Sequence, residues 1–310
     1  MYGLLKPHFK KCGFKFLKIK VNKEKLIEFI LKLSAIVTIL TTVGILYVLL
    51  SESISFFKEV SIIEFLTNKQ WTPLFVKKNF GILPLVTGTL LTTFIAVSVA
   101  LPVGITIAIY LSEYANRTFK KITKPLLEIL AAVPTVVYGF FALVVVTPFL
   151  QSFIPNLSGF NSLSAGIVMG IMIIPYVSSL SEDALSAVPK SLRNASYGMG
   201  ATRLQTSFRV VVPAASSGII VSVILAFSRA IGETMIVAIA AGQQPRLTAD
   251  PTVPISTITA YIVQVAKGDV PHNSLEYKTI FAAGISLFIL TFLLNNISFY
   301  IRKKFREQYD

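Results

Sequence analysis

Two charged side chains, Arg229 and Glu233, lie inside a segment, 213–242, that is otherwise almost wholly apolar and long enough to cross a bilayer. Each such charge costs about 2.5–3.5 kcal/mol at the centre of a membrane helix. A spacing of four residues puts both on one helical face, where they can neutralise each other. The pair is therefore either a structural pair that fixes the helix or part of a water-accessible pathway. In a pathway, Arg229 would donate two parallel hydrogen bonds to an oxyanion, and Glu233 would orient Arg229 or release the anion.

The residue types that build most metal and catalytic sites are scarce in this chain. It contains one cysteine, Cys12, and two histidines, His8 and His272, which lie far apart in the sequence. These counts exclude an internal disulfide framework and a cysteine or histidine metal site. The chain also has no G-x-x-x-x-G-K-[ST] phosphate loop and no evident nucleophile with a base. We therefore expect no catalytic residue, no bound metal and no cofactor.

Composition and hydropathy patterning indicate a membrane protein. Of the 310 residues, 54% are hydrophobic and 14% are charged, and apolar runs of eighteen or more residues recur. This pattern predicts an all-α polytopic membrane protein with six transmembrane helices, in which one N-terminal helix precedes a five-helix core. The predicted spans are 26–50, 83–111, 125–150, 162–180, 213–242 and 279–301.

Lysine and arginine are distributed unevenly between the predicted loops. The segments 1–25, 113–125, 181–213 and 302–310 hold 20 of the 29 such residues, whereas the loops on the other side hold 7. Because cytoplasmic loops are enriched in these residues, the bias predicts an inner-membrane protein with both termini in the cytoplasm. It also accounts for the net charge of +14 without a nucleic-acid partner.

Both ends of the chain are basic. In the N-terminal tail, 1–25, lysines alternate with aromatic and aliphatic residues. This tail either rests on anionic membrane lipid or only fixes the orientation of the first helix. The C-terminus, 302–310, is its basic cytoplasmic counterpart. Between them we expect a first transmembrane helix with an extracytoplasmic loop at 26–83 and the main transmembrane domain at 84–301.

The segment 181–213 is too long for a simple turn and too polar for a membrane span. Its spacing predicts a helix that Pro189 and Gly198 interrupt, and a second helical stretch from Thr202 to Pro213. Two short helices around a glycine-centred bend would make a compact knob on the cytoplasmic face. Such a knob is either a solvated loop or a surface that a partner grips.

The motif N-A-S-Y-G-M-G, followed nine residues later by V-V-V-P, resembles the EAA loop of binding-protein-dependent ABC importer permeases. In that family the loop forms a coupling helix that docks in a cleft of a cytosolic ATPase. This chain differs at Asn194, where Glu is usual, and at Ser196, where a second Ala is usual. The resemblance implies a set of ATPase-coupling residues: Asn194, Ala195, Ser196, Gly200, Ala201, Thr202 and Pro213.

The sequence S-R-A-I-G-E-T-M-I-V-A-I-A-A-G at 228–242 resembles the fifth-helix signature of the phosphate ABC permeases, in the form of the PstC-type subunit. The stretches 88–115 and 131–143 are similar to that family as well. The resemblance implies a MetI-like permease core and import of inorganic phosphate by alternating access. It implies as partners a second related permease subunit, a cytosolic ATPase dimer and an extracytoplasmic phosphate-binding protein. The candidate pathway residues are Arg229, Glu233, Thr234 and Tyr138.

Three alternatives stay open at this point. An ABC importer that carries sulfate or molybdate would show the same pattern of spans and charges, because one arginine can bind any of these oxyanions. An ion-coupled carrier without an ATPase is expected to show internal repeats and several ionisable groups on broken helices, and the sequence shows one pair and no convincing repeat. A sensor that reports phosphate to signalling proteins would use the 1–25 tail.

Overall fold

A computed structural model describes residues 14–272 and 274–304, and the regular structure within these ranges is helical. Of the predicted basic ends, residues 1–13 and 305–310 lie outside the described residues. The chain divides into two compact units, 1–51 and 52–310. The elements are α1 (Phe14–Phe57), α2 (Ile62–Thr67), α3 (Leu83–Ile109), η1 (Tyr110–Tyr114), α4 (Arg117–Ala132), α5 (Thr135–Phe141), η2 (Ala142–Val146), α6 (Thr147–Gln151), α7 (Ser162–Ala187), α8 (Lys190–Gly198), α9 (Arg203–Thr206), η3 (Ser207–Val211), α10 (Val212–Ala214), α11 (Ser216–Ile231), α12 (Met235–Ala240), α13 (Ile258–Lys267) and α14 (Leu275–Lys304).

The first unit consists of most of α1. The predicted span 26–50 lies within this helix, which begins at Phe14 and so includes half of the predicted basic tail. Its apolar side chains are almost all exposed from residue 24 to residue 51. The hydroxyls of Ser34, Thr38, Thr41 and Thr42 donate to carbonyls four residues earlier in the same helix. A helix with an apolar surface and internally satisfied polar groups suits a lipid environment.

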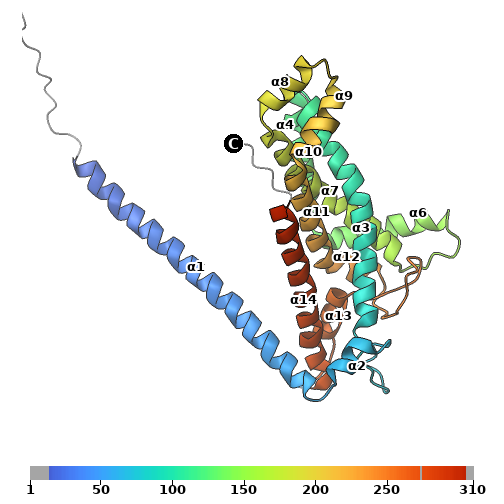
Figure 1. The fold of residues 1–310 in the computed structure, drawn as a ribbon. Helices are drawn as coiled ribbons and strands as arrows, with labels where there is room; N and C mark the ends of the chain where they lie inside the picture. Colours follow the sequence, from blue (N-terminus) through green and yellow to red (C-terminus); the bar gives the residue numbers. More distant parts are fainter. Residues whose placement is uncertain (1–13, 273, 305–310) are drawn as a thin grey trace, which may run out of the picture. The chain divides into compact units, whose positions relative to one another are not determined.

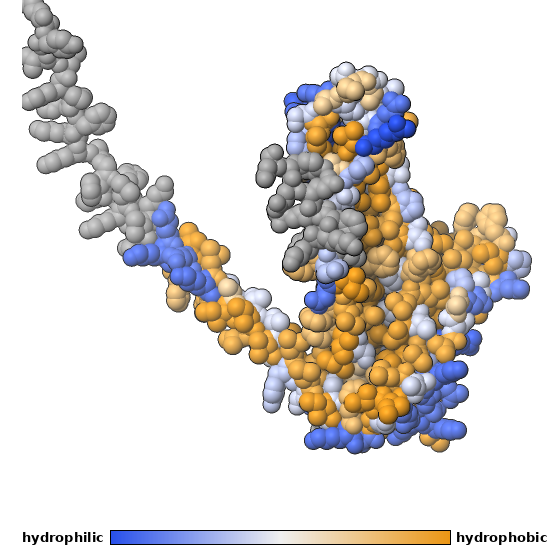
Figure 2. All heavy atoms as spheres, in the orientation of Figure 1, coloured by the Kyte–Doolittle hydropathy of each residue, from blue (hydrophilic) through white to orange (hydrophobic). Residues whose placement is uncertain are grey.

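The second unit is a helical bundle built on α3 and α7, which pack along each other (Figure 1). Helix α11 packs against both of them, and α14 packs against α11. Small and branched side chains such as Ala96, Ala100, Val168 and Ile173 fill the centre and are fully buried. Figure 2 shows hydrophobic residues over the middle of this unit and hydrophilic residues gathered at its two ends, as expected for a membrane bundle.

Within the described residues, six segments are long and apolar enough to cross a membrane when each of two bent helix pairs counts as one span. The predicted span 125–150 is bent by 85° between α4 and α5. Pro134 causes this break, because it directs Val133 into an extended conformation (φ −60°, ψ 130°) and cannot donate a helical hydrogen bond. A second bend of 71° at Ala215 separates α9–α10 from α11. The other four spans are unbroken helices: 24–57, 83–114, 162–187 and 275–297.

The fourth span extends beyond its predicted end. The sequence predicts a span that stops at residue 180, whereas α7 continues as one helix to Ala187. The additional turns are polar in composition, yet they bury Ser181, Glu182 and Leu185 against neighbouring helices. Packing against neighbouring helices therefore stabilises these turns, although their hydropathy did not predict that they continue the span. The helix ends only just before Pro189.

An aromatic cluster closes the end of the bundle opposite α8 and α9. Trp71 forms an isolated β-bridge with Phe80 and is 1% exposed. Edge-to-face contacts connect Trp71 to Phe65 of α2 and to Tyr261 of α13, with ring centroids 6.0 and 5.0 Å apart. Such contacts add about 0.5–1.5 kcal/mol per pair beyond their buried area. The cluster thereby ties the loop before α3 to the helix that precedes α14.

The close packing of α3 and α7 gives a testable prediction at Gly170. An added Cβ there would lie 2.7 Å from the Ala96 carbonyl oxygen and 2.8 Å from Val99 Cβ. Because backbone cannot withdraw without separating the helices, we expect Gly170→Ala to lower the free energy of unfolding by about 1–3 kcal/mol. Thermal unfolding in detergent, followed by fluorescence of the single tryptophan, measures the change.

The matched control is Gly44→Ala in α1, where no atom lies within 4 Å of the added Cβ. The same substitution there removes backbone freedom from the unfolded chain, so it should leave stability unchanged or slightly raised. If Gly170→Ala proves as stable as this control, α3 and α7 do not approach each other as closely at Gly170 as the structure shows.

Candidate functional site

Arg229 and Glu233 lie at a break between two helices. Arg229 is in the last turn of α11, and its Nη1 is 3.8 Å from Glu233 Oε2, so the predicted pair forms. The expectation of one continuous helix through 213–242 is wrong, because α11 ends at Ile231 and α12 starts at Met235. The charges therefore sit where free backbone groups of two helix ends are also available.

The Glu233 carboxylate is fixed by the start of α12. Its Oε1 accepts hydrogen bonds from the backbone N–H groups of Met235 (3.0 Å) and Ile236 (3.4 Å). The hydroxyl of Thr259 donates to the Glu233 carbonyl oxygen at 2.7 Å. A carboxylate at a helix N-terminus satisfies otherwise unpaired donors and is favoured by the helix dipole. Glu233 is thus buried and held in place whether or not Arg229 stays beside it.

Arg229 is less constrained than its partner. Its side chain is 39% exposed, whereas that of Glu233 is 3% exposed. The guanidinium carbon lies 5.9 Å from the ring centroid of Tyr176 on α7, within cation–π range. Arg229 Nε is buried and has no hydrogen-bond partner in the part of the chain that the structure describes. With its long contact to Glu233, the guanidinium retains donors for an incoming anion.

A cavity of about 710 Å³ opens beside Arg229. Helices α4, α7 and α11 supply most of its wall, which is largely apolar but carries Lys124, Glu128, Glu182 and Arg229. A mostly apolar wall with a few charges lowers the local dielectric and strengthens each electrostatic contact inside. The complete lining is Leu111, Lys124, Leu127, Glu128, Ala131, Pro175, Tyr176, Ser179, Leu180, Glu182, Leu225, Ser228 and Arg229.

Of the four candidate pathway residues, Arg229 lines this cavity and the other three do not. Tyr138 is buried, and its hydroxyl donates to the Leu130 carbonyl oxygen at 2.7 Å. That bond joins α5 to α4 across the 85° bend, so the tyrosine braces the bend. Thr234 precedes α12, and its hydroxyl donates to the Gly232 carbonyl oxygen at 3.2 Å.

Two charged residues of the cavity were missed by sequence reasoning. Lys124 Nζ of α4 lies 2.5 Å from Glu182 Oε2 of α7, and Lys120 Nζ lies 3.7 Å from the other carboxylate oxygen. From hydropathy, Glu182 is predicted to lie beyond the end of the fourth span, at the start of the polar segment 181–213. The signal that was available is the spacing of Arg117, Lys120, Lys121 and Lys124, which puts the cations on one face of an amphipathic helix.

The polar segment 181–213 forms the predicted helix–bend–helix only from Pro189 onward, because its first seven residues belong to α7. We call residues 189–214 the knob: it contains α8, α9, η3 and α10. Gly200 adopts φ +81° between α8 and α9, a conformation that glycine takes without steric cost. Thr202 then caps α9, because its hydroxyl accepts from Gln205 N while the Gln205 side chain accepts from Thr202 N. Figure 1 shows the knob at one end of the bundle.

Large apolar side chains are exposed on the knob. Met199, Leu204 and Phe208 are 89%, 59% and 55% exposed. Of the predicted coupling residues, Asn194, Ala195, Gly200, Thr202 and Pro213 are exposed, whereas Ser196 and Ala201 are half-buried. The Ser196 hydroxyl bonds the Thr206 hydroxyl at 2.9 Å and so holds α8 against α9. This surface has the chemistry of a docking site.

A buried ion pair fastens the knob to the bundle. Arg193 of α8 donates from Nη2 (2.8 Å) and Nε (3.3 Å) to Glu113 Oε1, which lies in η1 at the end of α3. The same guanidinium donates to the carbonyl oxygens of Leu185 and Val188 at the end of α7. Sequence reasoning placed Glu113 in a charged turn, and no local pattern indicated its partner. One arginine thus joins three helices.

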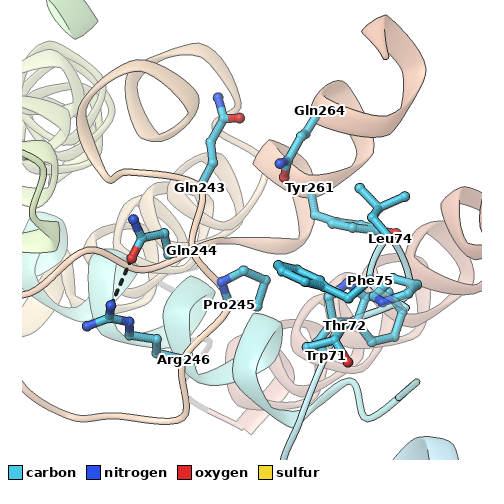
Figure 3. A pocket seen from close by; sticks show the side chains of 11 residues that line it. Trp71, Thr72, Leu74, Phe75, Gln243, Gln244, Pro245, Arg246, Tyr261 and Gln264 are labelled. Atoms are coloured by element: carbon cyan, nitrogen blue, oxygen red, sulfur yellow. Dashed lines mark hydrogen bonds between the residues drawn. The ribbon is translucent and has the colours of Figure 1, made fainter. Parts of the chain in front are cut away.

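A second cavity, of about 370 Å³, lies at the end of the bundle away from the knob. Figure 3 shows the aromatic side chains of Trp71, Phe75 and Tyr261 on one side of it and Gln243, Gln244 and Arg246 on the other. Arg246 at its edge donates to the Gln244 side chain at 2.9 Å. Its position and its lining, in which Arg246 is the single charged residue, distinguish it from the Arg229 cavity.

The chain is similar to permease proteins over most of its length. Residues 100–307 match the model of the family described as binding-protein-dependent transport system inner membrane component. A probable ABC transporter permease, YqgH of Bacillus subtilis, is 38% identical and the match covers 76% of this chain and 75% of that protein. The phosphate transport system permease protein PstC of Mesorhizobium japonicum is 36% identical, with coverage of 76% and 77%.

Solved structures share the fold at lower sequence identity. A chain in the crystal structure of a bacterial alginate ABC transporter matches 91% of this chain and 96% of its own length, with a TM-score of 0.62 and 16% identity. A chain of the inward-facing MetNI methionine ABC transporter matches 73% of this chain and 95% of its own length, with a TM-score of 0.53 and 19% identity. The all-α, MetI-like architecture is therefore confirmed. On the evidence of the family model and of these relatives, the chain belongs to the binding-protein-dependent transport system inner membrane components, as a PstC-like ABC permease.

Proposed function

We propose that this chain is the transmembrane permease subunit of an ATP-driven importer that moves inorganic phosphate across the cytoplasmic membrane by alternating access. The proposal rests on Arg229, which is partly exposed, lines a cavity of the helical bundle and has hydrogen-bond donors without a partner among the described residues. Its carboxylate partner, Glu233, is held in place by other groups. The 36% identical relative named as a phosphate transport system permease supports phosphate as the anion.

The proposed orientation places the knob in the cytoplasm and the aromatic cluster outside. The segments that would face the cytoplasm hold 20 of the 29 lysine and arginine residues. With this orientation both termini are cytoplasmic, and the cavity beside Arg229 lies between the knob and the helix break that carries Glu233. The second cavity then faces the compartment from which the anion arrives.

The chemistry at Arg229 is an exchange of one anion for another. A phosphate that enters the cavity replaces the 3.8 Å contact of Arg229 with Glu233 by shorter, parallel hydrogen bonds. Glu233 retains its two backbone donors at α12, so it is not left without compensation. When Glu233 pairs with Arg229 again, the phosphate is released. Net transport requires the two access states to bind phosphate with different affinity.

The energy for that difference comes from a partner, because the chain has no phosphate loop of its own. The exposed apolar surface of the knob fits a cleft in a cytosolic ATPase dimer, and the Arg193–Glu113 pair carries the movement of the knob into the bundle. A second related permease subunit completes the pathway, and an extracytoplasmic phosphate-binding protein delivers the anion. The chain itself is a transport subunit rather than an enzyme.

The role of Arg229 is tested by Arg229→Gln. Loss of the charge-assisted hydrogen bonds should lower phosphate uptake by about a hundredfold, while assembly with the partners is retained. The measurement is substrate-stimulated ATP hydrolysis and uptake in liposomes that contain this chain, its partner permease, the ATPase and the binding protein. Phosphate, sulfate and molybdate are compared. Stimulation by another oxyanion would overturn the assignment of phosphate as the substrate but leave the assignment as an ATP-driven importer intact.

The control for this experiment is Arg117→Gln, which removes an exposed arginine at the start of α4 that lines neither of the two cavities. It should leave uptake unchanged. Undiminished phosphate uptake by Arg229→Gln would remove the arginine from the pathway.

The docking role of the knob is tested by Leu204→Ser. Leu204 is 59% exposed, so its truncation should not affect the fold, but it should weaken ATPase binding about tenfold through lost apolar contact. The dissociation constant between the detergent-solubilised permeases and the purified ATPase gives the result. Leu66→Ser, at a 55% exposed position of α2, is the control and should bind like the wild type. Equal binding by both variants would argue against docking at the knob.

The Arg193–Glu113 pair is tested by comparing a single and a double variant. Arg193→Met leaves a buried carboxylate unpaired and should cost about 3–5 kcal/mol of stability. Adding Glu113→Gln removes that charge and should restore much of the melting temperature. The double variant should still hydrolyse ATP but import less phosphate per ATP, because the knob is no longer fastened to α3. Wild-type coupling in the double variant would show that the pair does not transmit movement.

A further inference from the structure

The Lys124–Glu182 pair lies in the same cavity as Arg229 but nearer the knob. Glu182 Oε2 is 2.5 Å from Lys124 Nζ, and both residues line the cavity. The Glu182 side chain is 4% exposed, whereas that of Lys124 is 43% exposed. As with Arg229 and Glu233, the carboxylate is the buried member and the cation is the accessible one.

The distance between the two pairs follows from the packing of α7 on α11. The hydroxyls of Ser181 and Ser222 bond each other at 2.7 Å, which puts these residues at one level of the two helices. Glu182 is adjacent to Ser181, and Arg229 is seven residues beyond Ser222 in the direction away from the knob. Seven residues of α-helix span about 10 Å. The backbone positions of Glu182 and Arg229 are therefore offset by about 10 Å along the bundle, and the cavity that they share has a cation at each of these levels.

Glu182 has other partners when Lys124 leaves it. Lys120 Nζ lies 3.7 Å from its Oε1, and the Ser186 hydroxyl donates to the same oxygen at 3.2 Å. The carboxylate therefore does not become an uncompensated buried charge. Lys124 has three donors on a flexible stem and faces the further carboxylates Asp183, at 4.0 Å, and Glu128. The arrangement permits Lys124 to exchange Glu182 for another anion.

We propose that Lys124 forms a second anion position in this permease, on the cytoplasmic side of Arg229, and that Glu182 displaces the anion from it. The proposal rests on the proposed function, because it requires an oxyanion to enter the cavity. Phosphate released by Arg229 moves along the cavity to Lys124, where it replaces Glu182 as the partner of the ammonium group. The return of Glu182, together with the negative charges of Asp183 and Glu128, expels phosphate toward the cytoplasm.

The alternative is a purely structural role, in which the Lys124–Glu182 pair only holds α4 against α7. The two roles predict different outcomes when each member is neutralised. A brace loses the same contact in Lys124→Gln and in Glu182→Gln, so both variants should change in the same direction. An anion position loses its ligand in Lys124→Gln but loses its competitor in Glu182→Gln, so phosphate binding should change in opposite directions.

The experiment uses the complete transporter with both permeases and the ATPase. Binding of radiolabelled inorganic phosphate is measured by equilibrium dialysis without the binding protein, and ATP-driven uptake is measured in liposomes with it. Lys124→Gln should weaken phosphate binding about tenfold, and Glu182→Gln should strengthen it by a similar factor, the effect of one charge-assisted hydrogen bond. Both variants should slow uptake, the first through weak binding and the second through slow release.

Two further variants make the result interpretable. The double variant Lys124→Gln/Glu182→Gln leaves no unpaired buried charge, so it should fold even if a single variant does not, and it should bind phosphate weakly. Lys121→Gln, an exposed cation on the same helix that does not line the cavity, should behave like the wild type.

The outcomes separate this inference from the function on which it rests. Wild-type transporter that takes up no phosphate overturns the proposed function, and the inference with it. Wild-type uptake with binding that changes in the same direction in both single variants, or with wild-type binding in the double variant, overturns the inference alone. Opposite changes in the two single variants support Lys124 as an anion position.

Discussion

An ionised side chain inside the low-dielectric body of a membrane bundle is tolerated only when an opposite charge or polar groups compensate it. In three ion pairs of the bundle, the carboxylate is almost completely buried, with 3–4% of its side chain exposed, and the cation is more exposed. Arg229 and Lys124 are 39% and 43% exposed and can turn toward an incoming anion, whereas Arg193 is 15% exposed and is held by its hydrogen bonds. The pairs are Arg229 with Glu233, Lys124 with Glu182 and Arg193 with Glu113.

Helix α7 connects these pairs with one another. It places Tyr176 against the Arg229 guanidinium, carries Glu182, and ends with the carbonyl oxygens that Arg193 binds. Its glycine contacts with α3 leave no space for the two helices to slide independently. In the proposed mechanism, movement of the knob is therefore transmitted to both cationic positions of the cavity through one rigid pair of helices.

The helix breaks explain how polar groups are accommodated beside the cavity. A break inside a membrane exposes backbone groups that must find partners within the protein. At the bend of α4 and α5 the Tyr138 hydroxyl provides one, and at the end of α11 Glu233 caps the next helix while Thr259 binds its carbonyl oxygen. Glu233 thus accepts hydrogen bonds from backbone N–H groups that the break leaves free, and it also neutralises Arg229. The same carboxylate therefore serves both the fold and the proposed transport chemistry.

Sequence by itself determined the apolar segments, the Arg229–Glu233 pair and the helix–bend–helix of the knob, because hydropathy, a four-residue spacing and glycine or capping residues are local signals. Tertiary structure alone decided the extension of α7 to Ala187 and the pairing of Lys124 with Glu182, whereas the 85° bend has a local cause in Pro134. Sequence patterns predict that a charged residue near the end of a span is exposed to solvent, because they do not show whether a helix distant in the sequence packs over it. The second cationic position therefore became visible only when α4 was placed against α7.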